Sequence, residues 1–309
     1  MHQDVHIIPS DQIDQQKWDA CIDQSDAPLI YAKTFYLHHM ADEWHGVVWN
    51  DYECVMPIPW RKKYTIRYTY QVPFIQQLGF FKKKSGSSTR PFLEVLQKFC
   101  RYGYYAFNYA NNIPTPDASL KNNYILSLST YEAIAANYSS DLLQNLKKSV
   151  QYQLQYHRVS YEKVIDSFYE LYHQKTPHVS KNDFLNFKKL CSYLHQTGKI
   201  HCREVSGAKD ETLALILLLQ DGNRLYNMMN ATPLAGRKMA ANHFLIDKTL
   251  EEFCNKNLVF DFEGSDIPGI KNFYENFGAS LQPYASLQFN KLPAPIKYFT
   301  PHSCGRSKH

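Results

Sequence analysis

The sequence predicts an α/β protein in which two domains each contain a mixed, mostly antiparallel sheet flanked by helices. The first observation is that strand and helix patterns alternate cleanly between Asn223 and Asn290. The second is that the first half of the chain shows the same order of helices, hairpin, strand, helix and strand. The third is the length of 309 residues, which fits two domains of ordinary size.

The alternation is clearest in the last third of the chain. Arg224–Asn230 has the pattern of a strand, and a turn at Gly236 leads into a long helix. The run Leu258–Phe262 is short and apolar, which is typical of a buried strand. Pro268 stands in the first turn of a second helix, and Gly278 ends it because glycine readily adopts positive φ.

The first half begins with two predicted helices, one from about Asp14 and one over Thr34–Met40. The apolar runs Trp44–Trp49 and Glu53–Pro59 flank an Asn-Asp pair, which is a hairpin signal. An amphipathic helix over Arg90–Arg101 and a further strand complete the order.

The stretch Asn111–Asn123 contains two prolines and is the most linker-like part of the chain. We therefore expect an N-terminal domain over residues 1–128 and a C-terminal domain over residues 129–309. In this division the strand Tyr124–Leu128 completes the first sheet.

The second domain is expected to begin with three helices, over Ser139–Tyr156, Tyr161–Gln174 and Lys181–Thr197. Two consecutive strands follow, over Ile200–Val205 and Thr212–Leu219. The second of these strands is apolar without alternation, so we expect it in the middle of the sheet with both faces covered.

The composition bears on the charge of the ligand, on the cellular compartment and on membrane insertion. The net charge of +5 suits an anionic ligand without requiring one. The seven cysteines form no CxxC pair, which favours a reduced, cytoplasmic compartment. The sequence has no run of about 18 to 20 apolar residues that would span a membrane.

Chemical motifs are few. The 13 histidines show no metal-ligand spacing, so we expect no metal. Aromatic residues alternate in predicted strands, which indicates packing more than base stacking, and we expect no DNA partner. The basic clusters Arg61–Lys63 and Lys82–Lys84 are interpreted either as solvated loops or as a phosphate-binding patch.

The order of elements after Asn223, the segment from Phe260 to Tyr284 and the segment from Met56 to Phe81 resemble the GNAT superfamily of N-acyltransferases. The closer resemblance is to the FemAB-like, tandem-GNAT branch of Bacteroidetes-type bacteria. It implies transfer of an acyl or aminoacyl group from acyl-CoA or aminoacyl-tRNA to an amine acceptor, such as a cell-envelope precursor. Fem-like enzymes have a basic helix near the position of Lys147, which we therefore expect to bind substrate.

The expected donor site is the turn between the strand and the helix. In GNAT proteins this helix offers backbone amides to the pyrophosphate of acyl-CoA, and Gly236, Arg237, Lys238 and Met239 occupy that place here. Free amides at a helix start beside two cations are typical of an anion site. The superfamily signature differs from this chain, which has Pro233 and Lys238 at two signature positions, so the alternative is that Gly236 only turns the chain.

Glu263 is the expected general base, because it follows the strand beside which the core strands of this superfamily separate around the acyl group. Asp261 lies two residues earlier on the same face, and like-charge repulsion would raise the pKa of one of the two carboxyls. Tyr274, four residues before Gly278, matches the tyrosine that many GNAT enzymes use as general acid. The alternatives are a capping or ion-pairing role for Glu263 and a structural role for Tyr274.

Two further residues are expected to bind substrate amides or to satisfy backbone groups, namely Asn230 and Asn242. Two hypotheses for the whole chain follow. The first is an N-acyltransferase that uses acyl-CoA or aminoacyl-tRNA. The second is a catalytically silent tandem-GNAT protein that binds a metabolite or a partner, which the altered donor signature favours.

Overall fold

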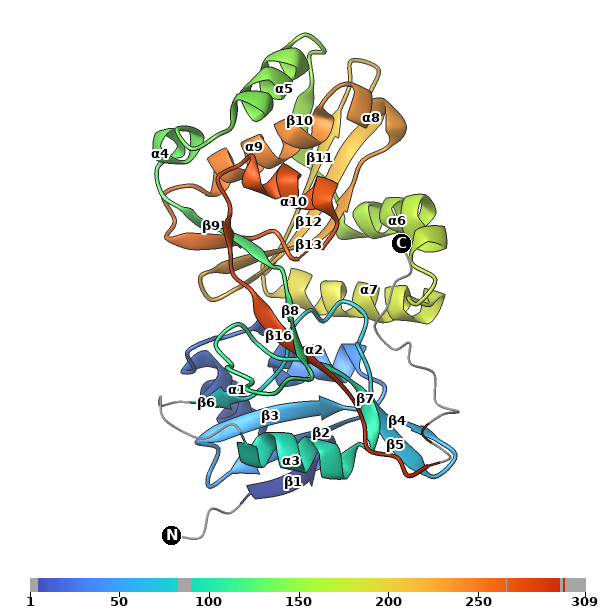
Figure 1. Ribbon diagram of the computed structural model, residues 1–309. Coiled ribbons are helices and arrows are strands. Elements are labelled where there is room, and N and C mark those ends of the chain that lie inside the picture. Colours follow the sequence, from blue (N-terminus) through green and yellow to red (C-terminus); the bar gives the residue numbers. More distant parts are fainter. Residues whose placement is uncertain (1–4, 83–89, 265, 295–296, 298–309) are drawn as a thin grey trace. The chain divides into compact units, whose positions relative to one another are not determined.

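The computed structural model describes residues 5–82, 90–264, 266–294 and 297 (Figure 1). The chain forms two compact units, Met1–Lys121 together with Pro283–His309, and Asn122–Gln282. Both units combine mostly antiparallel strands with helices, which confirms the predicted fold class. Among the described residues, no helix is both long enough and apolar enough to cross a membrane.

The first unit contains a four-stranded sheet of order β1-β2-β3-β6 and a five-stranded sheet of order β4-β5-β7-β16-β8. The strands of the first sheet are β1 (Val5–Pro9), β2 (Trp44–Trp49), β3 (Cys54–Pro59) and β6 (Phe81–Lys82). Those of the second are β4 (Arg61–Lys63), β5 (Ile66–Thr69), β7 (Tyr102–Ala106), β8 (Ala118–Lys121) and β16 (Tyr284–Asn290). The helices are α1 (Gln15–Asp23), α2 (Thr34–Met40) and α3 (Arg90–Phe99), with single turns η1 (Ser10–Gln12) and η2 (Ile30–Ala32).

Local patterns predicted most elements of the first unit. The helices α1 and α2 and the hairpin β2–β3 form where the sequence indicated them. The side chain of Asp14 accepts the amide of Lys17 at 3.1 Å and caps α1. On the buried face of α1, Trp18 donates its indole N–H to the carbonyl of Ala32 at 2.9 Å, which ties α1 to the turn before α2.

The second unit contains one seven-stranded sheet of order β10-β11-β12-β13-β14-β9-β15. Its strands are β9 (Tyr124–Leu128), β10 (Gln155–Arg158), β11 (Ile200–Ser206), β12 (Thr212–Asp221), β13 (Arg224–Ala231), β14 (Leu258–Asp261) and β15 (Ser280–Leu281). Its helices are α4 (Tyr131–Ala135), α5 (Ser140–Val150), α6 (Tyr161–Tyr172), α7 (Lys181–Gln196), α8 (Leu234–Lys238), α9 (Ala241–Phe253) and α10 (Pro268–Glu275), with the turn η3 (His173–Lys175).

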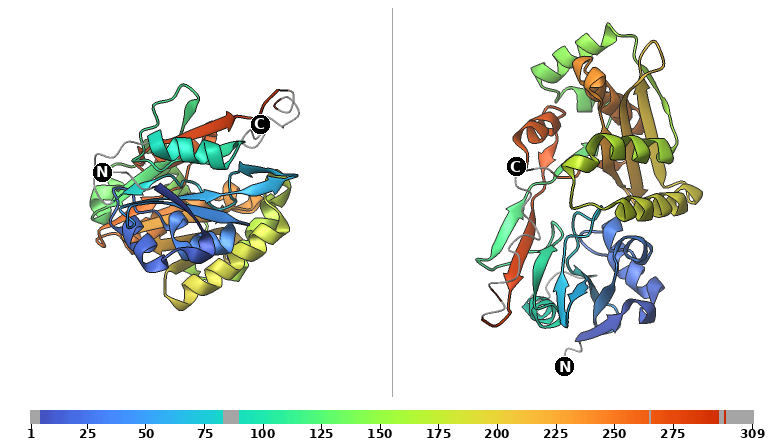
Figure 2. Two further views of the ribbon diagram at one scale, coloured as in Figure 1. Left: turned by 90° about the horizontal axis from the view of Figure 1, so that it is seen from below. Right: turned by 90° about the vertical axis from the view of Figure 1, so that its right-hand side faces the viewer.

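The strand β12 lies in the interior of this sheet, between β11 and β13, as its apolar sequence predicted. All side chains from Leu213 to Leu219 are fully buried, so both faces of the strand are covered. Both α6 and α9 pack against β12. In the right-hand view of Figure 2, α6 and α7 lie in front of the strands of this sheet.

Two strands belong to different sheets from those expected. Tyr124–Leu128, expected in the first sheet, forms β9 and pairs with β14 and β15 of the second unit. Conversely, β16 pairs with β7 and β8 of the first unit. The two units therefore differ from the predicted domains 1–128 and 129–309, because these ladders join residues that are far apart in the chain.

The helix α5 ends earlier than expected. Ser139 caps its first turn, as the sequence indicated, but the helix stops at Val150. Gln153 has a left-handed backbone with φ of 51°, and Gln155–Arg158 then pairs with β11 as β10. The predicted helix through Tyr156 is wrong, because pairing with a distant strand outweighs local helical preference.

The single long helix expected after β13 is two helices. The first, α8, ends at Lys238, and Ala240 then takes a left-handed conformation with φ of 55° before α9 begins. Gly236 neither opens a helix nor turns the chain, since it lies buried inside α8. A Cβ atom on Gly236 would lie 1.8 Å from the carbonyl oxygen of Leu213 in β12, so glycine is required for this packing.

Replacing Gly236 with Ala is expected to destabilise the protein by about 3 kcal/mol or more, because the added methyl group meets backbone that cannot move aside. Gly269→Ala is the matched control, since a Cβ there meets open space, and it should change stability by about 1 kcal/mol at most. Urea denaturation of both variants measures the difference. Equal stability of the two variants would show that the contact with Leu213 does not require glycine.

Candidate functional site

A cavity of about 750 Å³ opens within the second unit. It is bounded by α6 and η3, by β13, by the end of α8 and the start of α9, and by α10 with the residue before it. Its lining residues are Phe168, Tyr172, Lys175, Thr176, Asn227, Asn230, Thr232, Arg237, Ala240, Asn242, His243, Ile267, Gly269, Ile270, Phe273 and Tyr274.

The cavity lies where two strands of the sheet separate. β13 pairs with β14 in parallel only over residues 224–226, and the remainder of β13 pairs with β12 alone. A β-bulge inserts Met228 into the β12–β13 ladder. Side chains three positions apart normally point to opposite faces of a strand, and the bulge brings Asn227 and Asn230 to the same side. Both therefore line the cavity.

These two asparagines carry polar atoms that the protein leaves unsatisfied. Within the described part of the chain, Asn227 Oδ1 and Asn230 Nδ2 have no hydrogen-bond partner. Asn227 is only 6% exposed, and a buried polar atom without a partner costs about 1–3 kcal/mol. A ligand with both a hydrogen-bond donor and an acceptor, such as an amide or an ester with a nearby hydroxyl, would satisfy both side chains.

The first turn of α9 also faces this cavity. Asn242 and His243 lie in that turn, where backbone amides have no acceptor within the helix and the helix dipole favours negative charge. Among the residues that the structure describes, nothing pairs with Asn242 Oδ1 or His243 Nδ1. Asn242 and His243 therefore bring two buried polar atoms without protein partners to the wall of this cavity.

His243 is suited to accept a proton. Its ring packs edge-on against Phe273, with the ring centroids 5.0 Å apart. Burial lowers the pKa of His243 below the ordinary value of 6.5, so the imidazole is neutral at pH 7. A neutral imidazole with one ring nitrogen lacking a protein partner is an appropriate general base.

Two cationic side chains, Arg237 and Lys175, line the same cavity. Arg237 donates to the carbonyl of Thr232 at 3.2 Å and to the hydroxyl of Tyr172 at 3.4 Å, and Lys175 lies 5.7 Å from the centre of the Tyr172 ring. Neither cation has a carboxylate partner among the described residues, and the lining set contains no Asp or Glu. The site therefore favours an anionic ligand.

The opposite wall is apolar and comes from the region of α10, with Ile267, Ile270, Phe273 and Tyr274. The ring of Tyr274 packs against that of Phe262 at 4.7 Å between centroids. Burial and the nearby carboxylates of Glu263 and Asp261 raise the pKa of Tyr274, so its hydroxyl keeps its proton at neutral pH. Tyr274 is therefore a potential proton donor and not a base.

The two predicted carboxylates do not line the cavity. Asp261 is almost fully buried and accepts hydrogen bonds from Arg224 Nε at 2.8 Å and from the amide of Glu263 at 2.9 Å. Burial raises the pKa of Asp261 and the Arg224 guanidinium opposes that shift. Glu263 is half-buried, has φ of 60°, and lies outside the lining set. Asp261 thus forms a buried ion pair with Arg224, and its predicted catalytic role stays a prediction.

The predicted donor turn does not offer all the free backbone amides that we expected. The amides of Arg237 and Met239 are already donated to the carbonyls of Pro233 at 3.1 Å and Ala235 at 3.3 Å. Lys238 is exposed away from the cavity, and Met239 packs against the core. Of the four residues predicted to bind the donor, Arg237 lines the cavity. The helix that begins at the cavity is α9 and not α8.

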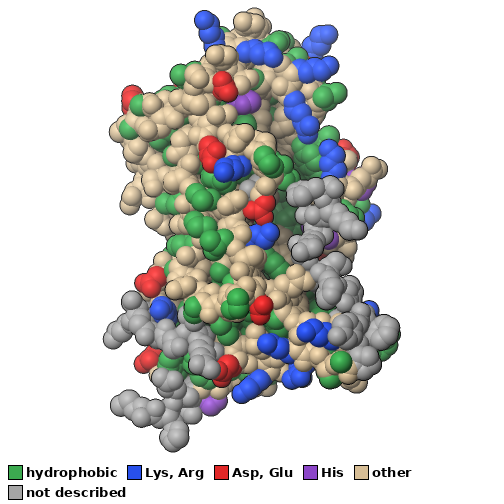
Figure 3. Space-filling view, viewed as in Figure 1, with side chains coloured by type: hydrophobic (Ala, Val, Ile, Leu, Met, Phe, Trp, Pro, Cys, Tyr) green, Lys and Arg blue, Asp and Glu red, His purple; other side chains and the backbone are tan. Residues whose placement is uncertain are grey.

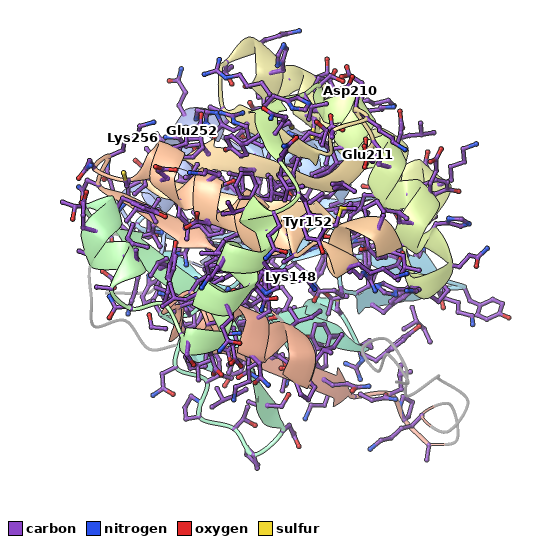
Figure 4. The ribbon with its side chains drawn as sticks, turned by 90° about the horizontal axis from the view of Figure 1, so that it is seen from above. Lys148, Tyr152, Asp210, Glu211, Glu252 and Lys256 are labelled. Carbon is purple, nitrogen blue, oxygen red and sulfur yellow. The ribbon has the colours of Figure 1, made fainter. Side chains whose placement is uncertain are left out.

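Two of the three residues predicted to bind substrate line the cavity. Asn230 and Asn242 come together in the cavity, although one lies on β13 and the other on α9. Lys147 is exposed on α5 and does not line this cavity, so its predicted role in substrate binding stays a prediction. Figure 4 labels the adjacent Lys148 on the same helix.

Sequence reasoning missed several lining residues, above all Asn227 and His243. A signal existed for Asn227, because asparagine is depleted in strands and this one stands inside a buried strand pattern. His243 follows Asn242 directly, yet its role depends on the helix break at Ala240, which no local pattern indicated. Lys175 and Tyr172 reach the cavity through the packing of α6 against β13, a tertiary contact.

Solved structures with the same arrangement of elements exist. The chain is similar to FemX, with 12% identity, coverage of 95% of this chain and 99% of that chain, and a TM-score of 0.61. It is also similar to a conserved protein of unknown function from Bacteroides thetaiotaomicron VPI-5482, with 10% identity, coverage of 90% and 98%, and a TM-score of 0.56. L-PGS from Bacillus licheniformis has 10% identity, coverage of 93% and 95%, and a TM-score of 0.51.

These similarities define the class of fold. The chain has the fold seen in FemX, which agrees with the FemAB-like fold that its sequence indicated. At such low identity the likeness concerns the fold and leaves donor and acceptor to be argued from the site. The sequence matches no family model and no curated protein.

Proposed function

We propose that this protein is an N-acyltransferase that binds an activated acyl group in the cavity between β13 and α10. The strongest support is that the unsatisfied asparagines, the first turn of α9 and His243 all line one cavity. This cavity lies where β13 and β14 separate. An acyl carbonyl needs hydrogen-bond donors, and an attacking amine needs a proton acceptor.

In this proposal each group has one task. The Nδ2 group of Asn230 and the first-turn amides of α9 donate hydrogen bonds to the carbonyl oxygen as negative charge develops on it. The amine nitrogen attacks the carbonyl carbon, a new C–N bond forms, and His243 takes the proton that the nitrogen loses. The bond from the carbonyl carbon to sulfur or ribose oxygen breaks, and Tyr274 protonates the leaving atom when that atom is a strong base.

The donor is proposed to be acyl-CoA or aminoacyl-tRNA, and both carry phosphates that Arg237 and Lys175 would attract. The amine acceptor is proposed to be a small molecule or a cell-envelope precursor. The residues that line the cavity include two cations and no carboxylate, so an acyl group whose side chain is positively charged is disfavoured.

A thermal-shift screen with free CoA, acyl-CoAs and aminoacyl-tRNA tests donor binding. A ligand at 100 times its dissociation constant should stabilise the protein by about 2.7 kcal/mol. Arg237→Ala should reduce the shift, whereas Lys238→Ala is the matched control, because Lys238 is exposed and lies outside the lining set. An equal loss in both variants would mean that general surface charge, and not the cavity, attracts the donor.

The alternative of a catalytically silent binding protein is supported by the altered donor turn, whose amides of Arg237 and Met239 are already donated. Ligand binding without any transfer to an amine would favour it. Transfer that depends on His243 would exclude it.

A further inference from the structure

The hairpin β4–β5 of the first unit presents an unusual residue at its tip. The register pairs Lys63 with Ile66, which leaves Tyr64 and Thr65 as a two-residue turn. Tyr64 is 88% exposed, the highest exposed fraction among the large hydrophobic side chains of the described residues. A tyrosine at this point contributes nothing to the core, so packing does not explain it.

The backbone of Tyr64 is also strained. Its φ is 55°, in the left-handed region, where bulky residues are rare and where asparagine or glycine is the usual choice in a two-residue hairpin turn. Such strain costs of order 1–3 kcal/mol and is typical of functional positions. An exposed aromatic residue held in a costly conformation indicates a contact outside the chain.

Positive charge surrounds this tip. Lys62 and Lys63 are exposed, and the ion pairs of the described chain include no carboxylate partner for either of them. Arg61 and Arg67 hold the base of the hairpin, since Arg61 pairs with Asp42 and the Arg67 guanidinium stands 4.6 Å from the centre of the Phe99 ring. The two lysines are therefore the charges available to a partner.

The sequence around the hairpin has one sign of charge. Residues 54–93 contain no Asp or Glu, and their basic residues are Arg61, Lys62, Lys63, Arg67, Lys82, Lys83, Lys84 and Arg90. Lys83 and Lys84 lie outside the described residues. In Figure 3, several Lys and Arg side chains lie together on the lower middle part of the first unit. A partner of this surface must be negatively charged.

We propose that the β4–β5 hairpin docks this protein onto an anionic lipid bilayer, with Tyr64 in the headgroup layer and Lys62 and Lys63 against the lipid phosphates. Tyrosine prefers the interface between water and lipid, and basic residues near it are attracted by anionic lipid. The tip is convex and carries one aromatic residue, whereas nucleic-acid strands bind grooves with several stacking side chains. The occupant that fits a single protruding aromatic residue with flanking lysines is a bilayer surface.

Co-sedimentation of the full chain with lipid vesicles tests the proposal. Binding is expected to vesicles of equal phosphatidylcholine and phosphatidylglycerol, and to be absent with phosphatidylcholine alone. The double variant Lys62→Ala/Lys63→Ala should bind about 30-fold more weakly, which corresponds to about 1 kcal/mol per lysine. Tyr64→Ala should weaken binding without changing its salt dependence.

The matched control is Lys147→Ala/Lys148→Ala, which removes two adjacent exposed lysines from α5 in the second unit. It should bind vesicles as the parent protein does, and circular dichroism should show that all variants are folded. The proposal is wrong if the parent protein does not bind anionic vesicles at physiological salt, or if both double variants lose the same affinity. It is also wrong if Lys62 and Lys63 are needed for binding single-stranded RNA but not for binding vesicles.

Discussion

Replacing His243 with Gln is expected to lower the single-turnover rate of acyl transfer by about 100- to 10,000-fold, the usual contribution of a general base. The reason is that His243 brings to the cavity a neutral imidazole whose Nδ1 has no partner in the described chain. Glutamine keeps a similar size and polarity, so donor binding and folding should remain. Rapid mixing with the donor identified by the ligand screen measures the rate.

The same experiment has an informative pH dependence. His243 must be neutral to accept a proton, and burial lowers its pKa below 6.5. The rate of the parent protein should therefore be constant near pH 7 and fall only as the pH drops through that lowered pKa. The His243→Gln variant should show no such fall, because it lacks the titrating group.

Two further variants show whether the loss is specific. His201→Gln is the matched control, because burial also lowers the pKa of His201, but its ring bonds Gln220 at 2.8 Å and it lies outside the cavity. Glu263→Gln should also keep most of the activity. Full activity of His243→Gln together with loss in Glu263→Gln would overturn the assignment to His243 and restore Glu263 as the base.

Replacing Arg224 with Met is expected to destabilise the protein by about 3–5 kcal/mol, because it leaves the buried carboxylate of Asp261 without its cation. Arg224 joins β13 to β14 through this ion pair, and a second guanidinium nitrogen, Nη2, donates to Oε1 of Gln282 at 2.5 Å. Urea denaturation at pH 7 measures the loss.

The double variant Arg224→Met/Asp261→Leu is the control. Removing both charges from a buried site is often neutral, so most of the lost stability should return. The single variant should also regain stability as the pH falls, because burial raises the folded-state pKa of Asp261 and protonation removes the uncompensated charge. A double variant that is as unstable as the single one would show that packing, not the unpaired carboxylate, causes the loss.

Much of the second unit follows from local sequence. The apolar run 213–219 predicted a central strand, and β12 lies between β11 and β13 with every one of these side chains buried. Ser180 predicted the start of α7, whose capping box with Asp183 is present. Gly278 predicted the end of α10 and has φ of 77°. These features depend on the residues of one segment, so the sequence contains the information.

The candidate site is predictable only in part. Four residues named from the sequence line the cavity, namely Asn230, Asn242, Arg237 and Tyr274, and their roles there stay predictions. Glu263 and Asp261 were predicted from their position at the end of a buried strand. The structure shows that the carboxylate of Asp261 forms an ion pair with Arg224 on the neighbouring strand. A single-segment pattern does not show which distant residue will pair with a charge.

The sequence by itself determined the α/β class and the positions of most helices and strands. The tertiary structure alone decided that β9 joins β14, that β16 joins β7 and β8, and that α8 and α9 are separated by a left-handed Ala240. The physical reason is the distance along the sequence over which each interaction acts. Helical periodicity and capping act over a few residues, whereas strand pairing, the bulge at Met228 and the contact of Gly236 with Leu213 depend on residues brought together only by folding.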